Sequence, residues 1–157
     1  MKILLIVAGK TEKRWLQAGV EEYAGRIGRY LPFEMVALPG VRATPKSSPE
    51  TVMVREGELF LPLMDGKREV YLLDEKGTEY SSRGFASFLE KKMVSGCREL
   101  LFVMGGPYGF SPAVQEKAAG KISLSRLTFS HQLVRLLFAE QLYRALTIVR
   151  GEPYHHD

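Results

Sequence analysis

The sequence predicts an α/β domain with a mostly parallel sheet and helices on both faces. Short apolar runs rich in branched residues alternate with longer stretches of helical periodicity from one end of the chain to the other. No internal repeat, low-complexity tract or linker interrupts this alternation. The 157 residues are therefore expected to form a single domain, 1–157.

Five segments have the composition of strands. The first, KILLIV at 2–7, is continuously apolar, which is typical of a strand buried on both faces. The others are FEMVAL, EVYLL, ELLFVM and KISLS, at 33–38, 69–73, 99–104 and 121–125. The turn DEKG follows the third of these strands.

Five helices are expected between and after the strands. Thr11 is the expected N-cap of the first helix, and Pro32 ends it. Its buried face is marked by apolar residues at steps of three and four: Leu16, Val20, Tyr23, Ile27 and Tyr30. The remaining helices are expected at 49–64, 81–95, 112–120 and 130–150.

The last helix is apolar around most of its circumference, which indicates burial on more than one side. In a domain of this size we expect a partner subunit on the second side. Arg135, Glu140 and Arg144 interrupt the apolar surface, which argues against a membrane. Glu140 and Arg144 are spaced for an i,i+4 ion pair, whereas Arg135 and Arg144 could also bind phosphate or hold a dimer together.

Composition says more about the cellular compartment of the protein than about its function. A net charge of +4 permits a polyanionic partner such as RNA without requiring one. The single cysteine, Cys97, can form neither an internal disulfide nor a thiolate metal site, so a reducing cytoplasm is expected. The apolar N-terminal run is too short to span a bilayer.

The stretch LFVMGGPYGF, at 101–110, ends a strand in a glycine-rich turn. Its G-G-x-x-G spacing and its place after the fourth strand do not fit a dinucleotide fingerprint, and no G-K-[ST] follows as in a P-loop. Two interpretations remain open: a turn that needs positive φ, or a loop whose missing side chains admit a ligand to the backbone.

Two further turns follow strands: DEKG after the third and LSRLTFS, at 124–130, after the fifth. Taken alone, each is more simply a turn or a helix cap. Ligands of open α/β sheets bind beyond the carboxyl ends of the strands. If the third, fourth and fifth strands are neighbours, the three turns converge on one pocket.

The chain closes on PYHHD. The adjacent His155 and His156 could ligate a metal, but no histidine pair with helical metal-ligand spacing occurs elsewhere, and we predict no metal. No nucleophile elbow or Cys/His pattern is present either. An exposed tail is the simpler interpretation.

Taken together, FVMGGPYGF, LSRLTFSHQLVRLLFAEQLYRA and the terminal PYHH resemble the SPOUT-class ribosomal RNA large subunit methyltransferase H family, which methylates N3 of a pseudouridine in 23S rRNA. The resemblance extends over essentially the whole chain. The C-terminal third carries the specific part: H-x-L-x-R, then E-x-x-Y-R-A, then Y-H.

The resemblance implies a C-terminal trefoil knot that holds S-adenosyl-L-methionine, a homodimer, and a substrate on the assembled ribosome. It implies cofactor contacts at Leu73, Gly105, Leu124, Ser125, Arg126, Leu127, Thr128 and Phe129. The one departure is Ser130, where the family commonly has proline; Tyr108 lies at a position where the family varies.

Methyl transfer to a ring nitrogen needs alignment and loss of the N3 proton. His155 is the first candidate for positioning the substrate or handling that proton, with Tyr154 and Arg144 as further catalytic candidates. His131 is equally well explained as a structural cap, and water could be the base. A methyltransferase of another RNA, such as tRNA, and a non-catalytic ribosome-binding factor remain alternatives.

Overall fold

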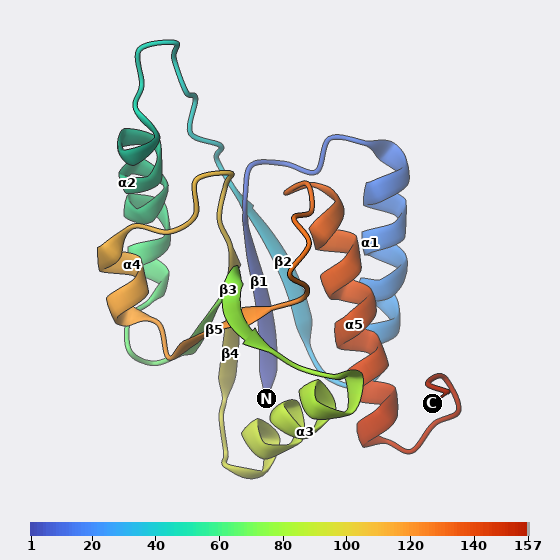
Figure 1. Ribbon diagram of the computed structural model, residues 1–157. Coiled ribbons are helices and arrows are strands. Elements are labelled where there is room, and N and C mark those ends of the chain that lie inside the picture. The colour runs from blue at the N-terminus through green and yellow to red at the C-terminus, as the bar shows by residue number, and fades with distance from the viewer. Residues whose placement is uncertain (157) are drawn as a thin grey trace.

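The computed structural model describes residues 1–156 and has the alternating order that the sequence predicts (Figure 1). The strands are β1 Lys2–Ala8, β2 Phe33–Leu38, β3 Glu69–Glu79, β4 Glu99–Met104 and β5 Gly120–Ser123. The helices are α1 Arg14–Ile27, α2 Pro49–Phe60, α3 Ser82–Val94, α4 Pro112–Lys117 and α5 Leu133–Val149, and a short 3-10 turn, Leu61–Leu63, follows α2.

All four strand pairs are parallel, in the order β2-β1-β4-β3-β5. The third, fourth and fifth strands are therefore neighbours, which is the condition for their three C-terminal turns to converge. The fold class predicted from the sequence is confirmed.

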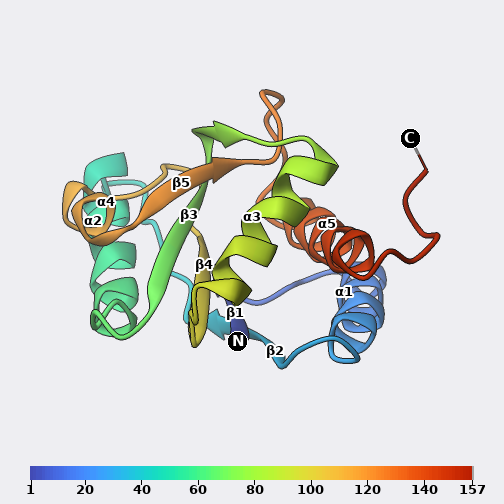
Figure 2. The same ribbon diagram turned by 90° about the horizontal axis from the view of Figure 1, so that it is seen from below.

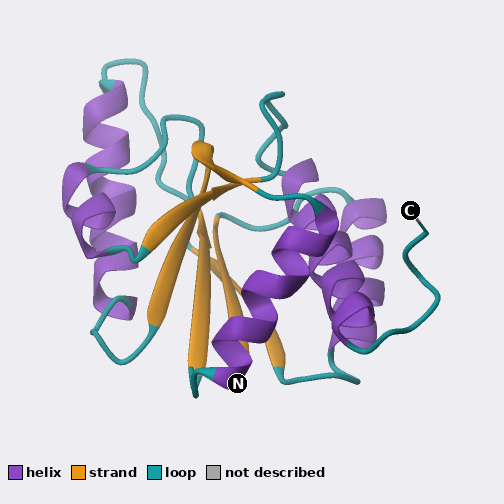
Figure 3. Ribbon diagram, turned by 60° about the horizontal axis from the view of Figure 1, so that its bottom comes forward, coloured by secondary structure: helices purple, strands orange, loops and turns teal. Residues whose placement is uncertain are grey.

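Helices cover both faces of the sheet (Figures 2 and 3). Alternation along β1 divides its side chains between two cores: Ile3 and Leu5 face the layer of α1, α3 and α5, and Leu4 and Ile6 face α2 and α4. Successive residues of a strand point to opposite faces, so a continuously apolar strand supplies both cores.

The last helix, α5, lies between α1 and α3, as Figure 2 shows. Phe138, Leu142 and Leu146 are fully buried there. Much of the apolar circumference that the sequence analysis attributed to a partner subunit is thus covered within one chain. The apolar residues that stay half-buried are Leu133, Val134, Leu136, Leu137, Tyr143, Ile148 and Val149.

Both ends of the first helix differ from the expectation, and two other helices are shorter than expected, since α4 ends at Lys117 and α5 begins at Leu133. Thr11 is not the N-cap of α1: that position is Lys13, and the Thr11 hydroxyl instead accepts a hydrogen bond from Arg135. The first helix also ends at Ile27, and Tyr30 lies in the turn that follows it.

The DEKG segment belongs to β3, not to a separate turn. Both Leu73 and Thr78 pair with Ile122, so the four residues between them leave the ladder as a bulge. A Cβ on Gly77 would lie 2.6 Å from the backbone nitrogen of Ile122. Glycine therefore permits the close approach of two backbones at this bulge.

Candidate functional site

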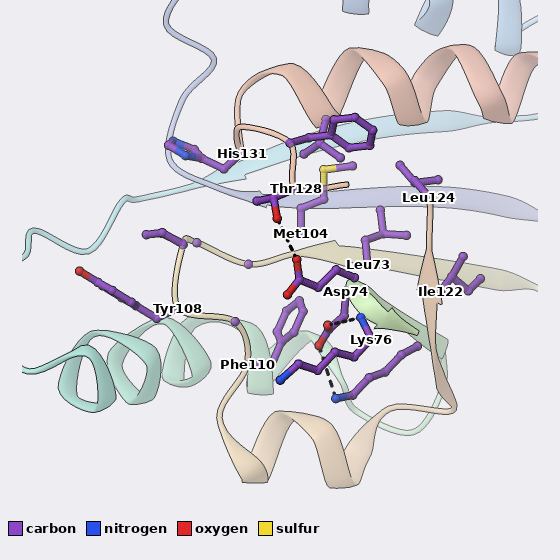
Figure 4. Close-up of a pocket in the computed structure, with 18 of the residues that line it drawn as sticks. Leu73, Asp74, Lys76, Met104, Tyr108, Phe110, Ile122, Leu124, Thr128 and His131 are labelled. Atoms are coloured by element: carbon purple, nitrogen blue, oxygen red, sulfur yellow. Dashed lines mark hydrogen bonds and ion pairs between the residues drawn. The ribbon is translucent and has the colours of Figure 1, made fainter. Parts of the chain in front are cut away.

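A cavity of about 830 Å³ opens at the carboxyl ends of β3, β4 and β5. In Figure 4, Tyr108 and Phe110 line one side, Thr128 and His131 line the other, and Leu73 lies at the strand ends between them. The volume lies within the range of roughly 300–1,000 Å³ that small-molecule and cofactor sites occupy. The convergence expected from the sequence is found here.

Most of the predicted cofactor residues border this cavity. Those that line it are Leu73, Gly105, Leu124, Ser125, Leu127, Thr128 and Phe129. Arg126 does not: its side chain is 87% exposed and forms an ion pair with Glu79 at 2.9 Å. Ser130, the departure from the family pattern, and Tyr108 also line the cavity.

The loop of 105–111 begins with two glycines at which an added Cβ would crowd a neighbouring side chain. A Cβ on Gly105 would lie 3.1 Å from the Phe110 ring, and one on Gly106 would lie 2.3 Å from a carboxylate oxygen of Glu56. Of the glycines in this loop, Gly109 has a positive φ, 78°. The GGPYG stretch is therefore both a turn and a wall of the cavity, and the two interpretations left open by the sequence are compatible.

Acidic side chains from the β3 bulge give the cavity a polar edge. The Asp74 carboxylate accepts a hydrogen bond from the Lys76 backbone at 2.9 Å and forms an ion pair with Lys121 at 3.4 Å. Glu75 accepts a hydrogen bond from the Thr128 hydroxyl at 3.2 Å, which links the bulge to the segment after β5 (Figure 4).

Hydroxyl groups fix the backbone of the segment between β5 and α5. The Ser125 hydroxyl accepts a hydrogen bond from Leu127 N–H at 2.9 Å, and the Ser130 hydroxyl accepts one from Leu133 N–H at 3.1 Å. Ser130 thus closes the turn that precedes α5, whose N-cap residue is Gln132, and the helix begins at Leu133 rather than at Ser130. The side chain that replaces the family's usual proline supplies this contact.

Arg144, Tyr154 and His155 do not line the cavity. Arg144 forms the i,i+4 ion pair with Glu140 at 2.6 Å that its spacing predicts, and its guanidinium lies 3.3 Å from Nδ1 of His155. The Tyr154 hydroxyl donates to the same Glu140 carboxylate at 3.1 Å. The three predicted catalytic residues therefore form one cluster, which the fold brings together on the outer side of α5.

Two tyrosines, one in α1 and one in the turn after it, contact the C-terminal tail that follows α5. The Tyr23 hydroxyl lies 3.4 Å from that of Tyr154, and Tyr30 donates a hydrogen bond to Glu152. Burial, the contact with Tyr23 and the neighbouring Glu140 raise the pKa of Tyr154. The Tyr154 phenol is thus a hydrogen-bond donor at neutral pH.

Arg135 is not placed to bind phosphate. Its side chain is 1% exposed and donates to backbone carbonyls of Ala8, Gly9 and His131 and to the hydroxyl of Thr11. Burial lowers the pKa of its guanidinium. The Arg135 guanidinium makes hydrogen bonds inside the protein. Helical periodicity alone could not distinguish this buried arginine from one on the surface.

The structure adds site residues that the sequence analysis did not single out. Met53, Met104, Gln115 and Lys121 line the cavity, together with Asp74 and Glu75 of the DEKG segment that the sequence had indicated. No helix among residues 1–156 is long and apolar enough to cross a membrane, and the same residues contain no group of three or more His, Cys, Asp and Glu side chains that could hold a metal ion.

The chain matches a known family and named relatives over essentially its whole length. Residues 1–155 match the family model described as "Predicted SPOUT methyltransferase". The chain is 52% identical to ribosomal RNA large subunit methyltransferase H of Porphyromonas gingivalis and 47% identical to that of Flavobacterium johnsoniae, each over 100% of both chains.

Among solved structures, a probable methyltransferase from Bordetella pertussis Tohama I superposes with a TM-score of 0.56 at 15% identity, covering 92% of this chain and 96% of that one. At this identity the likeness bears on the fold alone, which it supports. The family resemblance inferred from the motifs is confirmed by the full-length identities: the chain belongs to the SPOUT methyltransferases, in the family of ribosomal RNA large subunit methyltransferase H.

Proposed function

We propose that this protein transfers the methyl group of S-adenosyl-L-methionine to N3 of a pseudouridine in 23S rRNA. The observation that carries the proposal is the cavity at the ends of β3, β4 and β5, in a chain that matches its named relatives over their full length. The cavity lies where ligands of open α/β sheets bind.

The residues present fit S-adenosyl-L-methionine. Gly105 and Gly106 expose backbone groups to the cavity, Asp74 and Glu75 offer carboxylates for ribose hydroxyls or for a cationic ligand, and Leu73 and Phe110 supply apolar surface. The bound cofactor supplies an electrophilic methyl group on a sulfonium. Leu124, Ser125, Leu127, Thr128 and Phe129 would hold it from the side of α5. The trefoil knot expected of this segment stays a prediction.

For the reaction, the chain must hold the acceptor ring in line with the methyl donor and let the N3 proton leave. Alignment of donor and acceptor alone can lower the activation free energy by several kcal/mol. His155 is our candidate for positioning the ring, or for accepting the proton once its contact with Arg144 opens, and Tyr154 and Arg144 position His155. A guanidinium only donates, so while Nδ1 accepts from Arg144 the neutral imidazole carries its hydrogen on Nε2 and can donate from there. Arg144 bonds both Glu140 and the imidazole, and so fixes the orientation of that ring.

We further propose that the protein acts as a homodimer. Val134 borders the cavity, whereas Arg144 lies ten residues, roughly 15 Å, farther along the same helix. A second subunit packed on the half-buried apolar residues of α5 could bring its tail, with His155, to the cavity. Each site would then be completed by two chains.

The substrate proposed from the resemblance is the assembled ribosome in the cytoplasm. The net charge of +4 favours encounter with RNA. Arg126, which is highly exposed and ion-paired with Glu79, and exposed Lys76 on the bulge would contact phosphates. Both would act through charge and not through base readout.

The test is calorimetry with S-adenosyl-L-methionine together with transfer of tritiated methyl groups to ribosomes from a methylation-deficient strain, to isolated subunits and to tRNA. We expect binding, and methylation of ribosomes. Methylation of tRNA instead would favour the other RNA substrate, and absence of cofactor binding would favour a non-catalytic ribosome-binding factor.

His155→Ala is expected to keep cofactor binding and to lose methylation, with the neighbouring exposed His156→Ala as the matched control. Normal turnover by the His155 variant would remove the assigned role of this histidine without affecting the proposed function.

A further inference from the structure

A carboxylate is buried beneath the glycine loop of the cavity. Glu56, on α2, is 6% exposed, and its Oε2 accepts a hydrogen bond from Gly106 N–H at 3.0 Å. Burial raises the pKa of Glu56, against the effects of that hydrogen bond and of the charge of His131. A buried carboxylate costs stability unless its contacts compensate for lost hydration, so its presence here needs a reason.

The helix that carries Glu56 touches the glycine loop at two places. A Cβ on Gly106 would lie 2.3 Å from Oε1 of Glu56, and a Cβ on Gly57, the next residue of α2, would lie 2.6 Å from the Ser111 hydroxyl. Ser111 is itself buried. Two consecutive residues of α2 therefore contact the loop near its beginning and at its end.

The hydrogen bond to Glu56 also determines how one peptide of the loop is oriented. In a trans peptide the N–H and C=O groups point in opposite directions, and no cis peptide bond is present among the described residues. Because Gly106 N–H points to Glu56, the carbonyl of Gly105 points away from α2. Reversal of this peptide would aim the carbonyl oxygen at a carboxylate oxygen.

Glycine on both sides makes this peptide unusually free to reverse, because neither residue has a Cβ to restrict φ and ψ. An ionised carboxylate can only accept hydrogen bonds, so it stabilises one orientation and opposes the other. Gly105 and Gly106 both line the cavity. The orientation of their peptide therefore decides which backbone atoms a ligand meets.

We propose that Glu56 is a positioning residue of the cofactor site, which acts through Gly106 to hold the Gly105–Gly106 peptide in the orientation that S-adenosyl-L-methionine binds. The inference rests on the proposed function for the identity of the ligand. The orientation of the peptide, in contrast, is a property of the protein without ligand.

The test compares Glu56→Gln and Glu56→Leu with wild type. The Gln side chain can donate as well as accept, so it no longer selects one orientation, and Leu cannot accept at all. We expect the calorimetric Kd for S-adenosyl-L-methionine to rise several-fold in the first variant and about tenfold or more in the second, as for a lost hydrogen bond to a charged group. Exposed Glu58→Gln, on the same helix, is the control.

Thermal stability separates positioning from a purely structural role. Glu56→Gln removes a buried charge, so its Tm at neutral pH should equal or exceed that of wild type even as affinity falls. Unchanged affinity in both variants, or a loss of affinity that merely accompanies a lower Tm in Glu56→Gln, would overturn the proposal.

Amide hydrogen exchange of Gly106 in the ligand-free protein tests the contact independently of the cofactor. Exchange should be faster in Glu56→Leu than in wild type, and unchanged protection would overturn the assigned contact. If wild type binds no S-adenosyl-L-methionine, the proposed function and the cofactor-positioning role both fail, whereas accelerated exchange alone would still establish the contact between Glu56 and the loop.

Discussion

The buried arginine of α5 offers a direct test of how the end of β1 is joined to the start of α5. Nη2 of Arg135 donates to Ala8 O at 2.7 Å, Nη1 donates to Gly9 O and to Thr11 Oγ1 at 3.0 Å each, and Nε donates to His131 O at 3.1 Å. One side chain thus connects the segment after β1 to the segment that borders the cavity. The perturbation is Arg135→Met, which keeps the apolar stem and removes the guanidinium.

The magnitude follows from the acceptors that lose their donor. Three of them lie on Ala8, the last residue of β1, and on Gly9 and Thr11, which follow it, and each unsatisfied group costs about 1–3 kcal/mol. Removing the cost of burying the guanidinium offsets part of the loss. We therefore expect a fall of about 3 kcal/mol in the free energy of unfolding, which for a chain of this length lowers Tm by roughly 6–12 °C.

Urea denaturation followed by circular dichroism, at one protein concentration, measures the change. Arg126→Met is the matched control: its side chain is 87% exposed, so the free energy of unfolding should change by less than about 0.5 kcal/mol. A fall of less than about 1 kcal/mol in the free energy of unfolding of Arg135→Met would refute the reasoning. It would mean that these acceptors do not need the Arg135 guanidinium as their hydrogen-bond donor.

Three further predictions concern single contacts. Gly77→Ala should lower Tm, because its Cβ would lie 2.6 Å from the backbone of β5; an unchanged Tm would show that the bulge relaxes freely. Ser130→Ala should cost about 1 kcal/mol in urea denaturation, the usual net worth of one hydrogen bond, because Leu133 N–H loses its acceptor; equal stability would show that this contact does not stabilise the turn before α5. The Tyr30 phenol, whose pKa is raised to about 12 by its hydrogen bond to Glu152 and by burial, should ionise near pH 12 in ultraviolet titration. Since the neutral phenol donates to that carboxylate, Glu152→Gln should lower this pKa toward about 10, and a midpoint that does not move would contradict the assignment.

The elements and the approximate place of the site could be predicted because they depend on local patterns. Branched apolar runs gave strands at Lys2–Ala8 and Glu99–Met104 within a residue of the prediction, because side-chain spacing follows directly from the backbone period. The glycines at 105 and 106 and the hydroxyl-rich stretch after β5 were identified as turns at strand ends. Parallel connection places such ends at one edge of the sheet.

The tail shows where local patterns stop being informative. The sequence could suggest His155, Tyr154 and Arg144 as a group only through family resemblance. Their contacts with each other and with Glu140 depend on how the chain turns back after α5. The periodicity of apolar residues does not predict such a turn, because no helix or strand spans it.

By itself the sequence determined the fold class, the order of elements and three turns able to meet a ligand. Only the tertiary structure decided that β4, β3 and β5 are neighbours and so join the turns in one cavity. It also decided that Arg135 and Glu56 are buried, with Arg135 against backbone carbonyls and Glu56 beneath a glycine loop. The physical reason is that strand order and burial arise from contacts between distant segments, whereas a charged residue on a helix has the same local pattern whether it meets water or a backbone group.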